Sequence, residues 1–224
     1  ALLSKTDLAT DMVGEFPELQ GIMGGIYARD QGEPEEVWKA IYYHYLPVGI
    51  QPDAPPIRGD LGVANVTWAA LSIADKIDTV VGLFGVGEKP TGSRDPLGIR
   101  RQAHGMLRVL TDLPELVGLD SRISIGSVRR LARSVHRDLF DGAEERETVF
   151  FLDRLRYLLE ERGFNVRNVR AVTHGDIDEL RPLDALRKLK VLPEFTDTPD
   201  LQRLATLFKR VKNIARELST GCSR

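Results

Sequence analysis

The segment GVANVTWAALSIADKIDTVVGLFG, residues 62–85, decides the fold class of this chain. Its apolar residues recur every three or four positions, which is the spacing of one face of an α-helix. The opposite side is also rather apolar, with Trp68 and Leu71 beside Asp75. Because a helix that is apolar nearly all round is typical of a protein interior, we expect a central helix on which Asp75 needs a salt-bridge partner or a metal ion. The expected inward stripe is Val66, Ala70, Ile73, Ile77, Val80 and Phe84.

The same spacing recurs through most of the chain. It predicts helices at 97–110, at 147–162 and at 199–218, and a further helix with Ser127 as its N-cap. Strand-like alternation is confined to the short segment 166–172. We therefore expect an all-α fold. In the helix after Ser127 the spacing places Val128, Leu131, Val135 and Leu139 inward, and Arg129, Arg130, Arg133 and Arg137 largely outward; in the last helix it places Leu201, Leu204, Leu207, Phe208, Val211, Ile214 and Leu218 inward.

Composition excludes several classes of protein. The 224 residues are 42% hydrophobic and 29% charged, as in an ordinary globular protein. No apolar run is long enough to span a membrane, so we expect no membrane partner. The single cysteine, Cys222, excludes a disulfide framework and fits a reducing, cytoplasmic compartment. The N-terminus enters an apolar pattern without an initiator Met, which indicates a piece of a longer chain.

A basic loop, GEKPTGSRDP at 87–96, raises the possibility of phosphate binding. It is not a Walker A loop, because Glu88 follows Gly87 where that motif needs lysine. Two readings remain open. The loop and the helix after it contact RNA or another subunit, or the loop is a capped connection in which Arg94 and Asp95 pair locally. The residues that would contact phosphates are Lys89, Thr91, Ser93, Arg94, Arg100 and Arg101.

Residue types with catalytic or metal-binding chemistry are scattered. The four histidines include no HxxxH or HExxH spacing, and no G-x-S-x-G nucleophile motif is present. His44 stands out because it lies among the aromatic residues of YYHYLP. We therefore assign no catalytic residue.

Three long strings are similar to one known family. EFPELQGIMG (15–24), GEKPTGSRDP (87–96) and LATLFKRVKNI (204–214) resemble the beta subunit of bacterial tetrameric glycyl-tRNA synthetase. The resemblance implies a helical domain of the His-Asp phosphohydrolase type at 1–140. It also implies the first part of a helical anticodon-binding domain at 141–224.

The resemblance further implies a role in tRNA recognition and assembly. The chain would support attachment of glycine to tRNA-Gly by an α2β2 enzyme, with the α subunit, a second β subunit and tRNA-Gly as partners. Glycine activation, with its ATP and Mg, would belong to the α subunit, so no cofactor is expected in this chain. On the last helix, the implied tRNA contacts are Lys209, Arg210 and Lys212.

The same resemblance bears on the acidic residues. ADKID at 74–78 is similar to the segment whose aspartate closes the metal site of His-Asp phosphohydrolases. At the expected His-Asp pair stands Thr6-Asp7, and a threonine hydroxyl is a poor replacement for imidazole. Tyr43 also precedes His44 where the family pattern has glutamate. We therefore expect a vestigial site at Asp7 and Asp75 with no metal. The alternatives are an active metal-dependent phosphohydrolase of nucleotides or cyclic phosphates, and a purely structural assembly scaffold.

Overall fold

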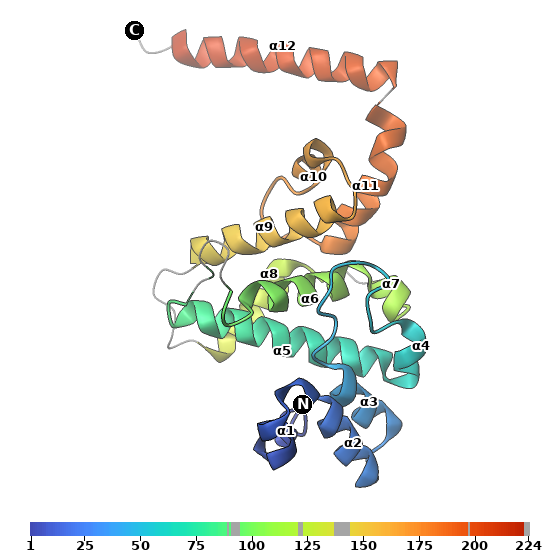
Figure 1. Cartoon of the computed structure of the whole chain (residues 1–224). Helices are drawn as coiled ribbons and strands as arrows, with labels where there is room; N and C mark the ends of the chain where they lie inside the picture. The colour runs from blue at the N-terminus through green and yellow to red at the C-terminus, as the bar shows by residue number, and fades with distance from the viewer. Residues whose placement is uncertain (89, 91–94, 121–122, 137–143, 197, 222–224) are drawn as a thin grey trace. The chain divides into compact units, whose positions relative to one another are not determined.

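The computed structural model describes residues 1–224 apart from 89, 91–94, 121–122, 137–143, 197 and 222–224 (Figure 1). Within the described residues the regular elements are all helices, which confirms the expected all-α class. Three short 3-10 helices are η1 (Thr6–Ala9), η2 (Pro17–Leu19) and η3 (Gly62–Ala64). The α-helices are α1 (Asp11–Glu15), α2 (Ile22–Asp30), α3 (Glu35–Tyr43), α4 (Arg58–Leu61), α5 (Asn65–Gly85), α6 (Ile99–Thr111), α7 (Leu113–Leu116), α8 (Ile125–Val135), α9 (Glu144–Glu161), α10 (Val166–Val172), α11 (Pro182–Thr196) and α12 (Pro199–Gly221).

The chain divides into two compact units. The N-terminal unit is Ala1–Leu186 and the C-terminal unit is Arg187–Arg224. The boundary between these units, after Leu186, differs from the boundary after residue 140 that the resemblance implies. The family domains at 1–140 and 141–224 remain a prediction.

Helix α5 is the centre of the N-terminal unit, where it packs against α3, α6 and α8 (Figure 1). Only part of the predicted inward stripe is correct. Ile77, Val80 and Phe84 are buried, but Val66 is half exposed. Trp68, from the other side of the helix, is fully buried, and its Nε1–H donates to the carbonyl of Tyr43 at 2.9 Å. Because α5 is apolar on both sides, the spacing of its apolar residues could not predict which side packs against the other helices.

The predicted faces of α8 are largely wrong. Arg130 is exposed as predicted, and Arg137 and Leu139 lie outside the described residues. The N-cap of α8 is Ser124, whose hydroxyl accepts from the amide of Ser127 at 3.1 Å, and Ser127 is not the cap. Leu131 and Val135 are 71% and 73% exposed, whereas Arg129 is buried. The physical reason is that the Glu147 carboxylate lies on the packed side and pairs with Arg129 Nε at 2.8 Å.

Helices α9 and α10 follow α8 in the chain. Helix α9 ends just before Gly163, whose φ of 87° suits a helix stop, as predicted. The segment 166–172, taken as the best strand candidate, is instead helix α10. The Asn165 side chain caps it by accepting from the amide of Arg167 at 2.9 Å, and this local cap favours the helix over a strand.

The C-terminal unit contains α12, which covers the helix predicted at 199–218. Those of its predicted inward residues whose side chains the structure describes are exposed instead; nothing is described of the side chains of Leu201 and Leu218. Amphipathic spacing identifies an apolar face but does not provide a partner that would bury it. The described apolar side chains on this face are Leu204, Leu207, Phe208, Val211 and Ile214, each more than half exposed.

Among the described helices, none is both long and apolar enough to cross a bilayer.

Candidate functional site

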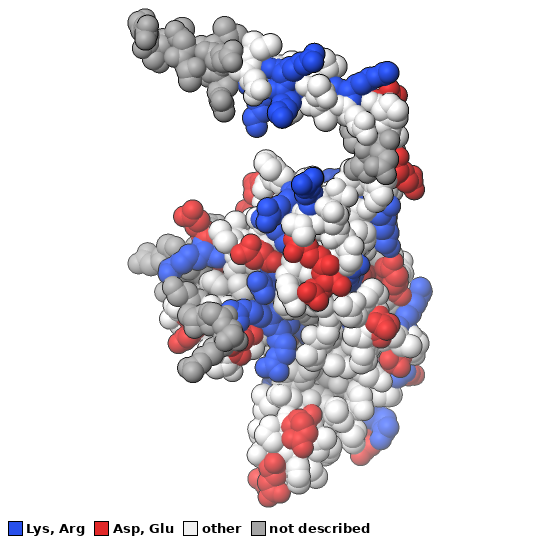
Figure 2. Space-filling model, turned by 45° about the horizontal axis from the view of Figure 1, so that its top comes forward, with Lys and Arg blue, Asp and Glu red and all other residues white. Residues whose placement is uncertain are grey.

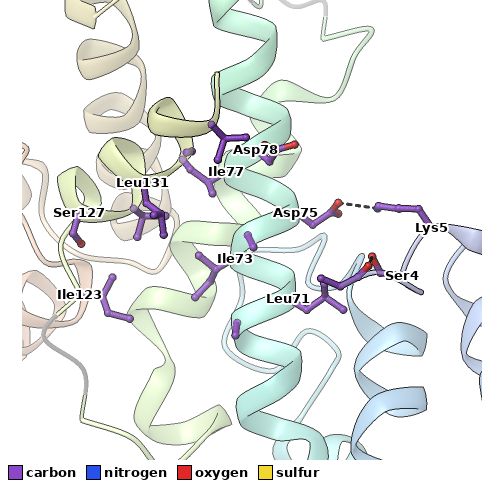
Figure 3. Close-up of a pocket in the computed structure, with 16 residues that line it drawn as sticks. Ser4, Lys5, Leu71, Ile73, Asp75, Ile77, Asp78, Ile123, Ser127 and Leu131 are labelled. Carbon is purple, nitrogen blue, oxygen red and sulfur yellow. Dashed lines mark hydrogen bonds and ion pairs between the residues drawn. The ribbon is translucent and has the colours of Figure 1, made fainter. Parts of the chain in front are cut away.

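The carboxylate of Asp75 on α5 meets a lysine from the N-terminal segment. Lys5 Nζ lies 2.8 Å from Asp75 Oδ1 (Figure 3). It also lies 3.0 Å from His44 Nε2 and 3.9 Å from the centre of the Tyr45 ring. Asp75 and His44 are brought together because α3 packs on α5. One ammonium from the N-terminal segment therefore contacts the Asp75 carboxylate on α5 and the neighbouring rings of His44 and Tyr45.

His44 is fully buried at the C-terminal end of α3. Burial lowers the pKa of His44 to about 4, so the ring is neutral at physiological pH. Its Nδ1 lies 2.6 Å from the carbonyl oxygen of Ile41, which can only accept, so we assign the ring proton to Nδ1. The lone pair of Nε2 then accepts a hydrogen bond from the Lys5 ammonium.

A second lysine, Lys76, holds the other side of His44. Its buried Nζ donates to the carbonyl of His44 at 2.7 Å, to Ser72 Oγ at 2.8 Å and to the carbonyl of Leu46 at 3.3 Å. Burial lowers the pKa of Lys76 to about 7, and the nearby Asp75 carboxylate opposes that shift. Lys76 thus binds the chain where it leaves α3.

Asp7 has a different role from Asp75: it binds backbone amides at the start of α2. Its Oδ2 accepts from the amides of Gly21 at 2.6 Å and Gly24 at 3.1 Å. These amides open α2, so Asp7 caps that helix from a distance in sequence. Thr6, which stands at the expected histidine position, is exposed, and its hydroxyl donates to the carbonyl of Leu3 at 2.9 Å.

The donor set does not fit the divalent cation that the resemblance implies. Asp75 already faces an ammonium, Asp7 Oδ2 is used by two amides, and Thr6 points to its own turn. Across the part of the chain that the structure describes, no three His, Cys, Asp or Glu residues are grouped as metal ligands. We therefore assign no metal-dependent reaction to the residues around Lys5 and Asp75.

An apolar groove opens beside Asp75, between α5 and α8. It has a volume of about 740 Å³ and includes Ile73, Ile77 and Leu131, with Lys5 and Asp75 toward one end (Figure 3). The sequence pattern missed this groove because it placed the apolar face of α8 inward.

The basic residues predicted to contact tRNA fall in both units. Lys89, Thr91, Ser93 and Arg94 lie outside the described residues. Arg101 is exposed at the start of α6, and the side chain of Arg100 is partly buried. The backbone amide of Arg100 donates to Asp95 Oδ2 at 2.9 Å, so Asp95 caps α6. On α12 of the C-terminal unit, Lys209, Arg210 and Lys212 are all exposed, and Figure 2 shows basic side chains along that helix.

Lys5 is the residue that sequence reasoning did not single out. The available signal was a lysine two positions before Asp7, in the segment where the family resemblance called for a metal ligand. Lysine is not a metal ligand type in that pattern, so its role became visible only once α3 and α5 were placed together.

Comparison with known proteins agrees with the resemblance. The family model described as glycyl-tRNA synthetase beta subunit matches residues 1–174. A glycine–tRNA ligase beta subunit of Ectopseudomonas mendocina is 38% identical over 98% of this chain and 30% of that protein. The glycine–tRNA ligase beta subunit of Acidithiobacillus ferrooxidans is 40% identical over 97% of this chain and 30% of that protein. The chain thus spans about 30% of the length of these relatives. With the model matching most of its length, this chain belongs to the glycyl-tRNA synthetase beta subunit family.

Proposed function

We propose that this chain is a tRNA-binding and assembly portion of a glycine–tRNA ligase beta subunit. In this role it supports attachment of glycine to tRNA-Gly by an α2β2 enzyme, together with the α subunit and a second β subunit. The relatives are named as beta subunits, and that name implies a complex with an alpha subunit. The active hydrolase alternative gains no support, because the position beside Asp75 is already taken by the Lys5 ammonium.

The observation that carries the proposed tRNA contact is the exposed face of α12. Lys209, Arg210 and Lys212 lie within a single turn of one helix, and none of them forms an ion pair with another residue that the structure describes. Cations fixed on a helix can bind successive phosphates of a nucleic acid, and the release of counterions makes such binding depend on salt. Contacts of this kind to the phosphate backbone carry no sequence information directly, so they should be shared by different tRNAs.

We expect the triple variant Lys209→Gln, Arg210→Gln, Lys212→Gln to bind tRNA-Gly roughly tenfold to a hundredfold more weakly, because up to three phosphate contacts are lost. The slope of log K against log salt should fall by roughly 0.7 to 1 for each contact. Gel-shift titration at several salt concentrations, with tRNA-Gly and an unrelated tRNA, measures both quantities. The loss should be similar for the two tRNAs.

A charge-matched control is provided by Arg167→Gln, Arg170→Gln, Lys188→Gln. These three residues are also exposed, so the control changes net charge equally. It should retain more of the affinity than the α12 variant does. Equal weakening in both variants would assign the effect to overall charge, and unchanged affinity in a folded α12 variant would remove α12 from the proposed interface.

We expect the chain alone to make no glycyl-adenylate. Its basic loop lacks the lysine of a Walker A motif, and in our proposal ATP and Mg are used by the α subunit. The measurement is glycine-dependent exchange of labelled pyrophosphate into ATP by the purified chain, with the reconstituted enzyme as the positive control. Exchange above background by the chain alone would contradict the division of labour between the subunits.

A further inference from the structure

The pocket around Lys5 has the geometry of a cation site. An imidazole nitrogen and a carboxylate oxygen, from α3 and α5, both point at one atom, Lys5 Nζ, from 3.0 Å and 2.8 Å. We propose that the Lys5 ammonium is a resident cation, which fills with the protein's own charge the place that a divalent metal ion would take between His44 and Asp75.

His44 is prepared as a metal-ligating histidine is. Its Nδ1 is bonded to the backbone carbonyl of Ile41, and this bond orients the ring and leaves the Nε2 lone pair directed into the pocket. Asp75 supplies an anionic oxygen from a side chain that is only 13% exposed. Two such acceptors attract a cation, and an ammonium, with three donors and no acceptor, satisfies both.

An ordinary surface salt bridge looks different in this chain. Lys39 pairs with Glu35 at 2.7 Å on its own helix, one turn away, and the glutamate is half exposed. Lys5 instead reaches a fully buried ring and a mostly buried carboxylate, and it also covers the face of Tyr45. Removing the Lys5 charge leaves these buried acceptors without a donor, which is costly in a low-dielectric interior.

The position of the Lys5 ammonium explains why His44 and Asp75 do not hold the metal ion that the family resemblance suggests. A lysine ammonium and a divalent cation cannot share one position, because their like charges repel at contact distance. The acceptors of a cation site are therefore retained at His44 and Asp75 while the ion itself is replaced by Lys5. This account concerns the pocket alone and does not depend on the proposed tRNA contact.

The test removes the ammonium in two ways. Lys5→Ala empties the position, and Lys5→Met occupies most of it with an unbranched side chain that has no charge and no N–H donor and whose thioether is a poor ligand for Co²⁺. In EDTA we expect both variants to melt several degrees below the wild type. With Co²⁺ added, only Lys5→Ala should gain thermal stability and the visible absorption of a cobalt–imidazole site. Both gains should be lost when Asp75→Asn is added to Lys5→Ala.

The controls are the wild type and Lys39→Ala. The wild type should contain no stoichiometric Mn, Fe or Zn by elemental analysis and should not respond to Co²⁺. Lys39→Ala should melt close to the wild type, because its carboxylate partner, Glu35, is 53% exposed whereas Asp75 is 13% exposed. About one metal ion per wild-type chain, unchanged melting of Lys5→Met, or no cobalt response by a folded Lys5→Ala would each overturn the proposal.

A measurement on the wild type covers the case in which the Lys5 variants do not fold. The ¹⁵N shifts of the His44 ring should report Nε2 as the unprotonated nitrogen between pH 6 and 8, as an acceptor of the Lys5 proton requires. A proton on Nε2 in that range would contradict the proposal, because the ring could not then accept from an ammonium.

Discussion

Replacing Asp112 with alanine is expected to lower the free energy of unfolding by about 3–5 kcal/mol, the usual result of removing one partner from a buried ion pair. Asp112 follows α6 and is buried. Its Oδ1 and Oδ2 accept from the two terminal nitrogens of Arg162 at 2.8 and 2.7 Å, and Oδ2 also accepts from Arg108 Nε at 3.4 Å. Without the carboxylate, two buried guanidinium groups lose their anion.

The loss of the Asp112 carboxylate should also destabilise the proline-containing segment before α4. Arg162 also donates to the carbonyl of Ile50 at 2.9 and 2.7 Å, and Arg108 donates to the carbonyl of Pro52 at 2.9 Å. Burial lowers the pKa of Arg108, and the Asp112 carboxylate beside it opposes this shift. Asp112 therefore holds both guanidinium groups in place as anchors for a segment that has few regular backbone bonds of its own.

Urea unfolding followed by circular dichroism measures the change. The matched control is Asp200→Ala, which removes an aspartate that is 93% exposed and 3.7 Å from Arg203. An exposed pair of this kind contributes little, so the control should unfold like the wild type. If Asp112→Ala and Asp200→Ala unfold at the same urea concentration, the buried network does not stabilise the fold as described.

The second large effect is expected at Gly25, where α2 packs tightly against α3. A Cβ at Gly25 would lie 2.5 Å from Tyr42 Cβ and 2.9 Å from the carbonyl oxygen of Trp38. Those distances are shorter than carbon atoms tolerate, and the backbone of α3 must move to relieve them. We expect Gly25→Ala to destabilise the chain by about 1–3 kcal/mol, the range for overpacking a tight interior.

Gly14 is the control for this substitution. It lies within α1, and a Cβ there would meet no atom within 4 Å. Because alanine is the better helix former by about 1 kcal/mol, Gly14→Ala should leave stability unchanged or raise it. Thermal unfolding of the two variants side by side makes the comparison, and equal destabilisation would show that the approach of α2 to α3 is looser than the structure has it.

Much of the secondary structure could be predicted from local patterns. The helices around 62–85, 147–162 and 199–218 were correctly placed because a 3.6-residue spacing and a glycine stop are properties of the segment itself. The errors at 166–172 and at Ser127 also have local causes. In each case a neighbouring cap, Asn165 or Ser124, decided the helix start, and the sequence pattern alone did not rank it above the alternatives.

The faces of the helices could not be predicted in the same way. Helix α8 carries apolar residues on one side and arginines on the other, so spacing favours burying the apolar side. The structure buries Arg129 instead, because Glu147 supplies a carboxylate on the packed side, at a separation of 18 residues. A pairing of this kind depends on which helices meet, and hydrophobic spacing contains no information about that.

The same distinction between local sequence patterns and tertiary contacts applies to the pocket around Lys5. The sequence by itself determined an all-helical chain, its family, and the presence of Asp7, Asp75 and His44, since these follow from spacing and from long matching strings. Only the tertiary structure decided that Asp7 caps α2 while Asp75 and His44 share the Lys5 ammonium. The physical reason is that Lys5 and His44 are 39 residues apart, and their hydrogen bond exists only where α3 packs on α5 beside the N-terminal segment.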